Sequence, residues 1–560
     1  MTLKTLLAAA LAASTALAQG LNYPAGLQPG DEYRVLFVTD STRDATSTDI
    51  SVYDAFVTAD ANAVPFLAAL NTNWRAVGST ATVSARDHTD TVSGGVPIFR
   101  PDGVRVADDY DHLWDAVTTS LPAGPAVTAS GALTTNELVW AGCWGDGTIS
   151  PWPLGSAGGQ AMAGIADFIN HFWVLWAPHP VTSSHRLYGI SDVLKMPYPD
   201  YPRDLKPGDQ FRILFVTDST RDATSSNIND YDDFVTADAQ VVPALQLFQT
   251  DWRAVASTPS VSARSHTGTT GSVGVPIYRP DGTRIANGYA HLWGTILATL
   301  LAPPNITATG AVTSASRVWT GTSAQGVSLG NQLGAVTGSS FAGEPGSTGL
   351  WHYFDSGAQG ANRPLYGISD VITVPEPKHP QDLQPGQRYR VLFLTDGTRD
   401  ATSANITDYD DFVSADADAV PAMRLYDTEW KAVASTPSVS AKVHTGTDPS
   451  VAGVPIYRPD GTHVANDYAS LWFGGLGALL APPNVTASGA VRSAPAYVWT
   501  GTDFHGNATF DPLGDANGYA WEGDAGSITV GWIWANSNHQ SHLRPLYGIS
   551  EVLFVQGKSV

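Results

Sequence analysis

The sequence predicts an α+β protein of three tandem copies of one domain, each made mostly of short antiparallel strands with a helix after the first strand. The strand-like segment RVLFVTD at residues 34–40 returns almost unchanged at residues 212–218 and 390–396, at an interval of 178 residues both times. The closing segment LYGIS also occurs three times, at residues 187–191, 365–369 and 546–550. A unit of this length can bury a core of its own, so we expect separate globular copies rather than a continuous solenoid.

Short proline-rich segments separate the copies. Such segments favour the extended polyproline II conformation and act as semi-rigid spacers. We expect these linkers at residues 195–204 and 373–382. The remaining boundaries then follow as a signal peptide at residues 1–18 and repeat domains at residues 19–194, 205–372 and 383–560.

Each element of the first copy has its own local signal. Dense β-forming residues at 33–38 predict the first strand, and residues 74–77 predict a short second strand. Apolar residues recur at three- and four-residue steps between Ile50 and Val64, which is the period of a helix. The Pro-Asp-Gly sequence within residues 96–106 predicts a hairpin turn. Further strands are expected at residues 139–140 and 187–194.

Tryptophan recurs at matching positions in every copy. Large aromatic residues beside apolar strands are usually buried, so we expect these side chains in the core. The recurring positions are Trp74, Trp252 and Trp430, then Trp114, Trp293 and Trp472, then Trp140, Trp319 and Trp499.

The charge balance limits the possible partners. The chain has 30 Lys and Arg against 52 Asp and Glu, a formal net charge of -22. Such a surface repels phosphate backbones and anionic lipid head groups, so we expect no nucleic-acid partner. Cations and neutral ligands such as sugars fit this charge better.

The first residues of the sequence read as an export signal. Lys4 precedes an apolar run at residues 6–13, and Ala16, Leu17 and Ala18 form a small-residue cleavage site. No second apolar stretch of about 20 residues follows, so we expect no membrane insertion. The sequence therefore predicts a secreted protein, extracellular or periplasmic.

Cysteine and histidine are too sparse for a disulfide or for a zinc site. Cys143 is the single cysteine of the chain, so an intrachain disulfide is impossible. His88, His266 and His444 occur once per copy, whereas zinc usually takes three or four protein ligands. We therefore expect no metal and no cofactor.

Three motifs in combination carry a resemblance to a known family. They are PIYRPDG at residues 276–282 and 455–461, VWTGT at 318–322 and 498–502, and the closing LYGIS segment. On these residues the chain resembles the C-type-lectin-like superfamily, with its endostatin-like branch and related exported bacterial domains of unknown function. The resemblance implies that first and last strands pair and that ligands bind at a long irregular loop before the last strand.

The chain also departs from that family. The disulfides and the calcium-dependent sugar-binding signature of the superfamily are absent, and the acidic composition does not suit the heparin binding of endostatin-like domains. The family's ligand-binding residues therefore do not carry over to any position of this sequence.

The segment before the last strand is where the copies differ most. It mixes aromatic residues with Gly, Ser, Asn and Asp, and a shared scaffold with a variable loop is a common way to carry recognition. Aromatic faces with polar neighbours suit sugar rings, although each aromatic residue could equally close the core below the loop. The candidate ligand-binding residues are Trp144, Trp152, Trp173, Trp176, Trp351, His352, Tyr353, Trp521, Trp532 and Trp534.

These patterns favour a secreted multivalent binding or adhesion protein whose partner is an extracellular glycan or a surface protein. An extracellular hydrolase is the alternative, and it requires the recurring Asp40, Arg43 and His88 to converge in one cleft. No nucleophile motif accompanies these residues. A structural protein of a surface or matrix is the third possibility.

Overall fold

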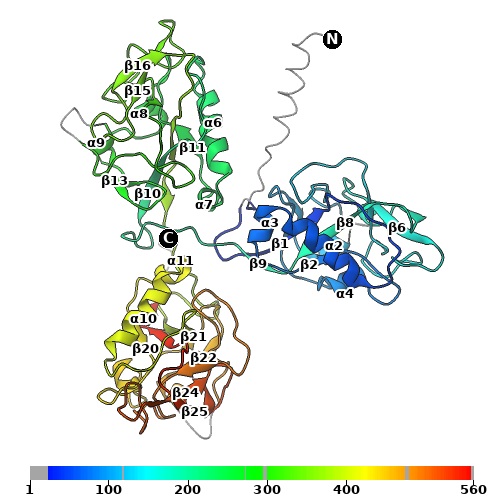
Figure 1. Ribbon diagram of the computed structural model, residues 1–560, viewed down its shortest axis with the longest axis vertical. Coiled ribbons are helices and arrows are strands. Elements are labelled where there is room, and N and C mark those ends of the chain that lie inside the picture. Colours follow the sequence, from blue (N-terminus) through cyan, green and yellow to red (C-terminus); the bar gives the residue numbers. More distant parts are fainter. Residues whose placement is uncertain are drawn as a thin grey trace. The chain divides into compact units, whose positions relative to one another are not determined.

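The computed structural model describes residues 23–24, 26–115, 119–271, 273–293, 299–472 and 478–555. It is a mixed α+β structure of short helices and several small sheets, which confirms the predicted class (Figure 1). Contacts divide the chain into two compact units, one of Met1–Pro199 with Phe211–Ile372 and one of Asp200–Gln210 with Thr373–Val560. The division into three domains therefore stays a prediction. The predicted signal peptide, residues 1–18, lies outside the described residues.

The first strand of copy one is central in its sheet. β1 (Glu32–Val38) pairs antiparallel with β8 (Arg186–Ser191) and parallel with β3 (Ile98–Phe99). β2 (Trp74–Ala76) pairs with the other edge of β8, and β5 (Leu138–Trp140) joins β8 in parallel. The first and last strands of the copy therefore lie side by side, as the resemblance implies.

The same pairing recurs in the other two copies. Each first strand has an antiparallel last strand on one edge and a short parallel strand on the other. In copy two these strands are β10 (Gln210–Val216), β17 (Tyr366–Ser369) and β12 (Ile277–Tyr278). In the second unit they are β19 (Arg388–Leu394), β26 (Tyr547–Ser550) and β21 (Ile456–Tyr457).

A glycine in each closing strand allows the sheet to pack tightly. In the first copy Phe37 pairs with Gly189, and a Cβ atom on Gly189 would overlap the Phe37 ring. Gly367 and Gly548 occupy the same place under the corresponding phenylalanines of the other copies. The glycine of the LYGIS motif is thus explained by the absence of space for a side chain.

A hairpin carries the segment in which the copies differ. In copy one it consists of β6 (Gln160–Ile165) and β7 (Ala177–Pro180), with β5 on the free edge of β6. The corresponding strands of copy two are β14 (Val318–Trp319), β15 (Ser339–Gly343) and β16 (Asp355–Ala358). Those of the second unit are β23 (Tyr497–Trp499), β24 (Tyr519–Asp524) and β25 (Asn536–His539).

The remaining elements are short and also recur from copy to copy. Copy one contains α2 (Ile50–Asn62), α3 (Pro65–Ala69), α4 (Ala85–His88), β4 (Arg105–Ala107), α5 (Tyr110–Trp114), a 3-10 turn (His171–Trp173) and β9 (Leu194–Lys195). Copy two contains α6 (Asn229–Gln240), α7 (Pro243–Gln246), β11 (Trp252–Ala254), α8 (Ala263–His266), β13 (Arg284–Ala286), α9 (Tyr289–Leu292) and β18 (Ile372–Thr373). The second unit contains α10 (Thr407–Asp418), α11 (Pro421–Arg424), β20 (Trp430–Ala432), α12 (Ala441–His444), β22 (His463–Ala465), α13 (Tyr468–Trp472), a 3-10 turn (Val530–Trp532) and β27 (Leu553–Phe554).

The predicted helix after the first strand is confirmed as α2. Asp49 caps its first turn by accepting a hydrogen bond from the backbone N–H of Ser51. Tyr53, Val57 and Ala61 recur at four-residue steps and are fully buried, so they form the face that packs on the sheet. The helical period in the sequence therefore predicted both the element and its buried side.

The recurring tryptophans lie in the core, as the sequence predicts. Among the nine positions the exposed fraction of the residue is at most 6%, and it is 0% for Trp140, Trp319 and Trp499. In the first copy the Trp140 indole also donates a hydrogen bond of 3.0 Å to the backbone carbonyl of Arg43. This tryptophan therefore links the variable hairpin to the loop after the first strand.

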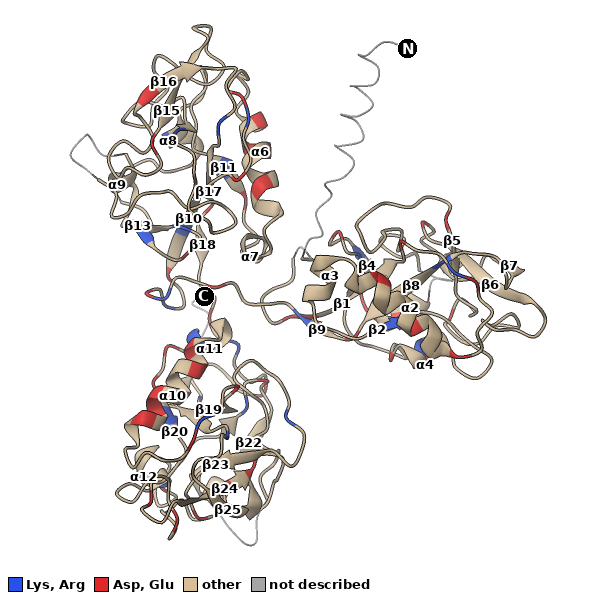
Figure 2. Ribbon diagram, viewed as in Figure 1, with Lys and Arg blue, Asp and Glu red and all other residues tan. Residues whose placement is uncertain are grey.

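Acidic residues recur along the longer helices, with several Asp residues in α6 and α10 (Figure 2). Among them, Asp232 and Asp410 face the sheet, and each accepts a hydrogen bond of 2.8 Å from a backbone N–H of the short strand beside the helix. Within the part of the chain that the structure describes, no helix has the length and apolar character needed to cross a membrane.

Replacing Trp140 by alanine is expected to destabilise the first copy by about 3–5 kcal/mol, because truncating a buried tryptophan leaves a cavity. Thermal melting of the full chain should then show a transition at lower temperature. Trp144→Ala is the matched control, since Trp144 is 40% exposed. Equal losses from both variants would contradict the burial pattern.

Cys143 is expected to resist thiol reagents in the native protein. Its side chain is 0% exposed within the core, and burial raises the pKa of the thiol far above its ordinary value, so little thiolate forms. A colorimetric thiol titration should therefore detect the cysteine only after denaturation. Rapid reaction of the native protein would contradict this placement.

Candidate functional site

The recurring Asp40, Arg43 and His88 do not converge. The Asp40 carboxylate accepts hydrogen bonds from the backbone N–H and the hydroxyl of Ser130, at 2.8 and 2.7 Å. The Arg43 guanidinium lies over the ring of Tyr53, 4.6 Å from its centroid. His88 binds neither of them and has an acid of its own. The geometry that the hydrolase alternative requires is therefore not present in this structure.

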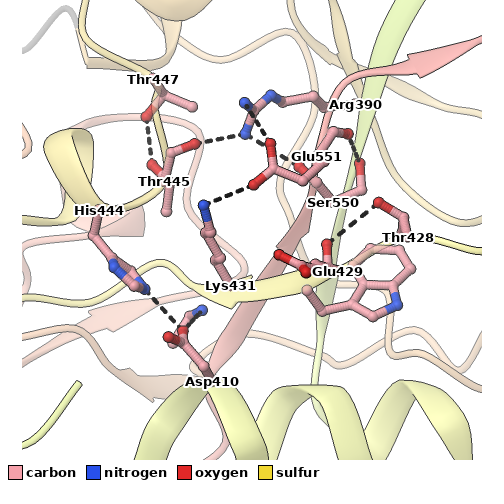
Figure 3. A network of polar contacts seen from close by, with 12 residues as sticks. Arg390, Asp410, Thr428, Glu429, Lys431, His444, Thr445, Thr447, Ser550 and Glu551 are labelled. Carbon is pink, nitrogen blue, oxygen red and sulfur yellow. Dashed lines mark hydrogen bonds and ion pairs between the residues drawn. The ribbon is translucent and has the colours of Figure 1, made fainter. Parts of the chain in front are cut away.

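His88 pairs with Asp54, an acid that the sequence analysis did not single out. Its Nε2 atom lies 2.8 Å from Asp54 Oδ1, and the same oxygen accepts a hydrogen bond of 2.8 Å from the backbone N–H of Ala76. Asp54 thus joins α2 to both α4 and β2. His266 with Asp232 and His444 with Asp410 repeat the pair at 2.8 Å, and Figure 3 shows the last of them.

A network of charged groups lies beside this pair in the second unit (Figure 3). Arg390 is 4% exposed and donates a hydrogen bond of 2.7 Å to the backbone carbonyl of Thr445. Glu551 lies 3.8 Å from Arg390 and 2.7 Å from Lys431. Because these charges already have partners, the network is best explained as part of the architecture.

Three of the candidate ligand-binding tryptophans belong to the core. Trp173, Trp351 and Trp532 are 0%, 1% and 3% exposed, and each packs on the buried tryptophan of the preceding helix region at 5.6 to 5.9 Å between ring centroids. The carbonyl of Trp173 accepts a hydrogen bond of 2.7 Å from the Tyr188 hydroxyl, and the other two copies repeat it. The prediction that these three residues bind a ligand is wrong, because their rings are buried in the core under the hairpin.

The prediction that His352 binds a ligand is wrong for the same reason. It is 3% exposed, and its Nε2 atom lies 3.0 Å from the carbonyl of Ala324. Burial lowers the pKa of this histidine to about 4, so the ring is neutral at pH 7. The ring of His352 is therefore packed in the interior and is not exposed on the surface of the hairpin.

The other six candidates reach the surface to different degrees. Trp144, Trp176 and Tyr353 are 40%, 48% and 38% exposed. Trp152, Trp521 and Trp534 are half-buried. These six residues remain available for contact with a ligand.

The hairpin strands present different residues at equivalent positions. One position lies two residues before the hairpin glycine that contacts the buried tryptophan of each copy. It is occupied by Met162, Phe341 and Trp521 in the three copies. The other position lies two residues after the buried tryptophan of each copy and is occupied by Leu175, Tyr353 and Trp534. We call these two positions, with the residues around them, the variable face. It is apolar in copy one and aromatic in the other two.

The variable face of the second unit holds four aromatic rings that pack one on the next in a row. Trp521 and Trp534 lie 5.1 Å apart between centroids, with their planes tilted by 38° rather than coplanar. Phe504 packs on Trp534 at 5.2 Å, and Phe510 packs on Trp521 at 5.8 Å. Phe510 is 76% exposed, so one end of this row is open to solvent.

The first two copies arrange their exposed rings differently. In copy two Phe341 and Tyr353 lie 4.9 Å apart, and Arg317 covers the ring of Phe354 at 4.1 Å. Copy one instead gathers three rings beside the 3-10 turn, at centroid distances of 5.4 to 5.8 Å. These rings belong to Phe168, Phe172 and Trp176.

Asp54→Ala is expected to cost copy one about 1–3 kcal/mol of folding free energy, because it leaves the N–H of Ala76 and the ring of His88 without their acceptor. His88→Ala and the double variant complete a cycle, in which the two losses should not add. The measurement is thermal or denaturant unfolding of the full chain. Unchanged stability in every variant would contradict a structural role for the pair.

No family model and no curated protein sequence matches this chain. The resemblance to C-type-lectin-like domains therefore stays a prediction, which the pairing of first and last strands agrees with at the level of topology. Among the described residues, no group of three or more His, Cys, Asp or Glu is placed to hold a metal ion.

Proposed function

We propose that the chain is an exported multivalent binding protein whose copies hold glycans on exposed aromatic surfaces. One observation carries the proposal: the buried frame of the hairpin recurs in every copy, while the rings above it change. Trp173, Trp351 and Trp532 keep the same packing, whereas the residues of the variable face do not. Variable side chains on a constant scaffold are a common arrangement in binding sites.

Glycans are the ligand class that this chemistry favours. Sugar rings place C–H faces on aromatic side chains and direct hydroxyls to polar groups at the edge. Ser356 and Ser537 lie directly across the hairpin from Phe341 and Trp521, so a hydroxyl stands beside each ring. The net charge of -22 disfavours sulfated or uronic acid polymers.

Three surfaces on one chain support binding by avidity. Joining several weak sites raises the overall affinity when the linkers let them reach the same target. Weak individual sites fit the small clusters of two to four packed rings in each copy. An exported protein meets polymeric glycans that present repeated epitopes, which suits binding by avidity.

Binding should depend on the exposed rings and not on the buried ones. We expect the full chain to be retained on a glycan array, and Trp534→Ala and Trp176→Ala to weaken retention while the melting temperature stays nearly unchanged. Trp173→Ala should instead lower the melting temperature, because Trp173 is 0% exposed. No retention on any glycan, or retention that survives both surface variants, would overturn the proposal.

A further inference from the structure

Asp511 is a nearly buried carboxylate without a cationic partner. The residue is 8% exposed, and its two oxygens accept hydrogen bonds from Asn517 Nδ2 at 2.5 Å and Ser537 Oγ at 3.0 Å. Both donors are neutral. Among the residues that the structure describes, no Lys, Arg or His side chain forms an ion pair with it. A buried charge is costly unless an opposite charge compensates it.

A second acid in the same hairpin shows how this fold compensates a buried charge. Glu522 is 1% exposed, and Arg544 lies 3.1 Å from its carboxylate. Trp521 and Glu522 are consecutive in β24, so their side chains point to opposite faces of the hairpin. The acid on the face opposite Trp521 thus has an arginine, whereas Asp511 on the side of Trp521 has none.

Asp511 belongs to the variable face. Its backbone carbonyl accepts a hydrogen bond of 3.0 Å from the N–H of Trp521. Ser537, which binds its carboxylate, lies directly across the hairpin from Trp521. The equivalent residues of the other copies, which make the same backbone bond, are Asn331 and Trp152. The negative charge is therefore specific to the second unit.

We propose that the variable face of the second unit binds an organic ammonium group, such as the free amine of an amino sugar. The proposal rests on the proposed glycan-binding function and names its ligand class. The faces of Trp521 and Trp534 attract a cation through their negative quadrupole. Asp511, whose carboxylate is bound by Ser537 directly across the hairpin from Trp521, supplies the opposite charge on this side of the hairpin. Asn517 is exposed, so its amide can give way to a charged donor, which forms a stronger hydrogen bond.

Three short probes separate the possible ligands. They are the linear trimers of glucosamine, of N-acetylglucosamine and of glucose, which share a β-linked chain and differ in whether a free amine is present. Isothermal titration of the full chain should show at least about tenfold tighter binding of the glucosamine trimer. This preference should weaken as the salt concentration rises, because charge attraction is screened.

Asp511→Asn is the decisive variant, since it installs the residue that copy two already carries at this position. It should remove the preference for the amine and leave the melting temperature nearly unchanged. Asp418→Asn is the control, because it removes the same charge from an exposed position in α10 and should leave the preference intact.

The outcomes distinguish this inference from the proposed function. Equal binding of all three trimers, or a preference for the amine that survives Asp511→Asn, would overturn the ammonium site and leave glycan binding in place. Binding of none of the trimers, with glycans bound elsewhere on the array, would also overturn it. No glycan binding in any assay would overturn both proposals.

Discussion

The pairing of the first strand of each copy with its last strand is the constraint on which the remaining structure depends. In copy one β1 lies against β8 with Phe37 over Gly189, a contact that no larger residue would permit. This pairing fixes the positions of both ends of the copy. The segments between the two strands then pack on the resulting sheet. The hairpin of β6 and β7 is one such addition, and β5 holds it through contacts with both β6 and β8.

Under the proposed function, stability and recognition depend on neighbouring positions of one small hairpin. In the hairpin the carbonyl of Trp173 packs against Gly164, and the same contact recurs with Trp351 and Trp532. Packing of this kind tolerates little change, since cores are close-packed and a lost ring leaves a cavity. The residue two positions before this glycine changes from copy to copy: it is the buried Met162 in one copy and the half-buried Trp521 in another. A frame of this kind can acquire different ligands without refolding.

Much of the fold could be predicted from the sequence because the repeat period exposed which residues are constant. The helix α2, the first strand and the recurring core tryptophans such as Trp140 were predicted in this way. The burial of Trp173 was not, because the variable segment differs in sequence between the copies and insertions in copy three shift its residues. A usable signal was present, since each of these tryptophans precedes the tyrosine of LYGIS by 15 residues. The partner of His88 could not be predicted, because 34 residues separate it from Asp54 and only the tertiary fold joins them.

The central claim is that a ligand contacts the variable face and leaves the frame unchanged, and hydrogen exchange measured by mass spectrometry tests it directly. With the glucosamine trimer bound to the full chain, amides in residues 503–518 and 525–535, which flank the rings of the second unit, should exchange more slowly. Amides of β19 and β26 should be unaffected, because the frame does not move. Protection centred instead on His444 and Asp410, with none near Trp534, would contradict the account. It would show that the ligand binds at the recurring polar network.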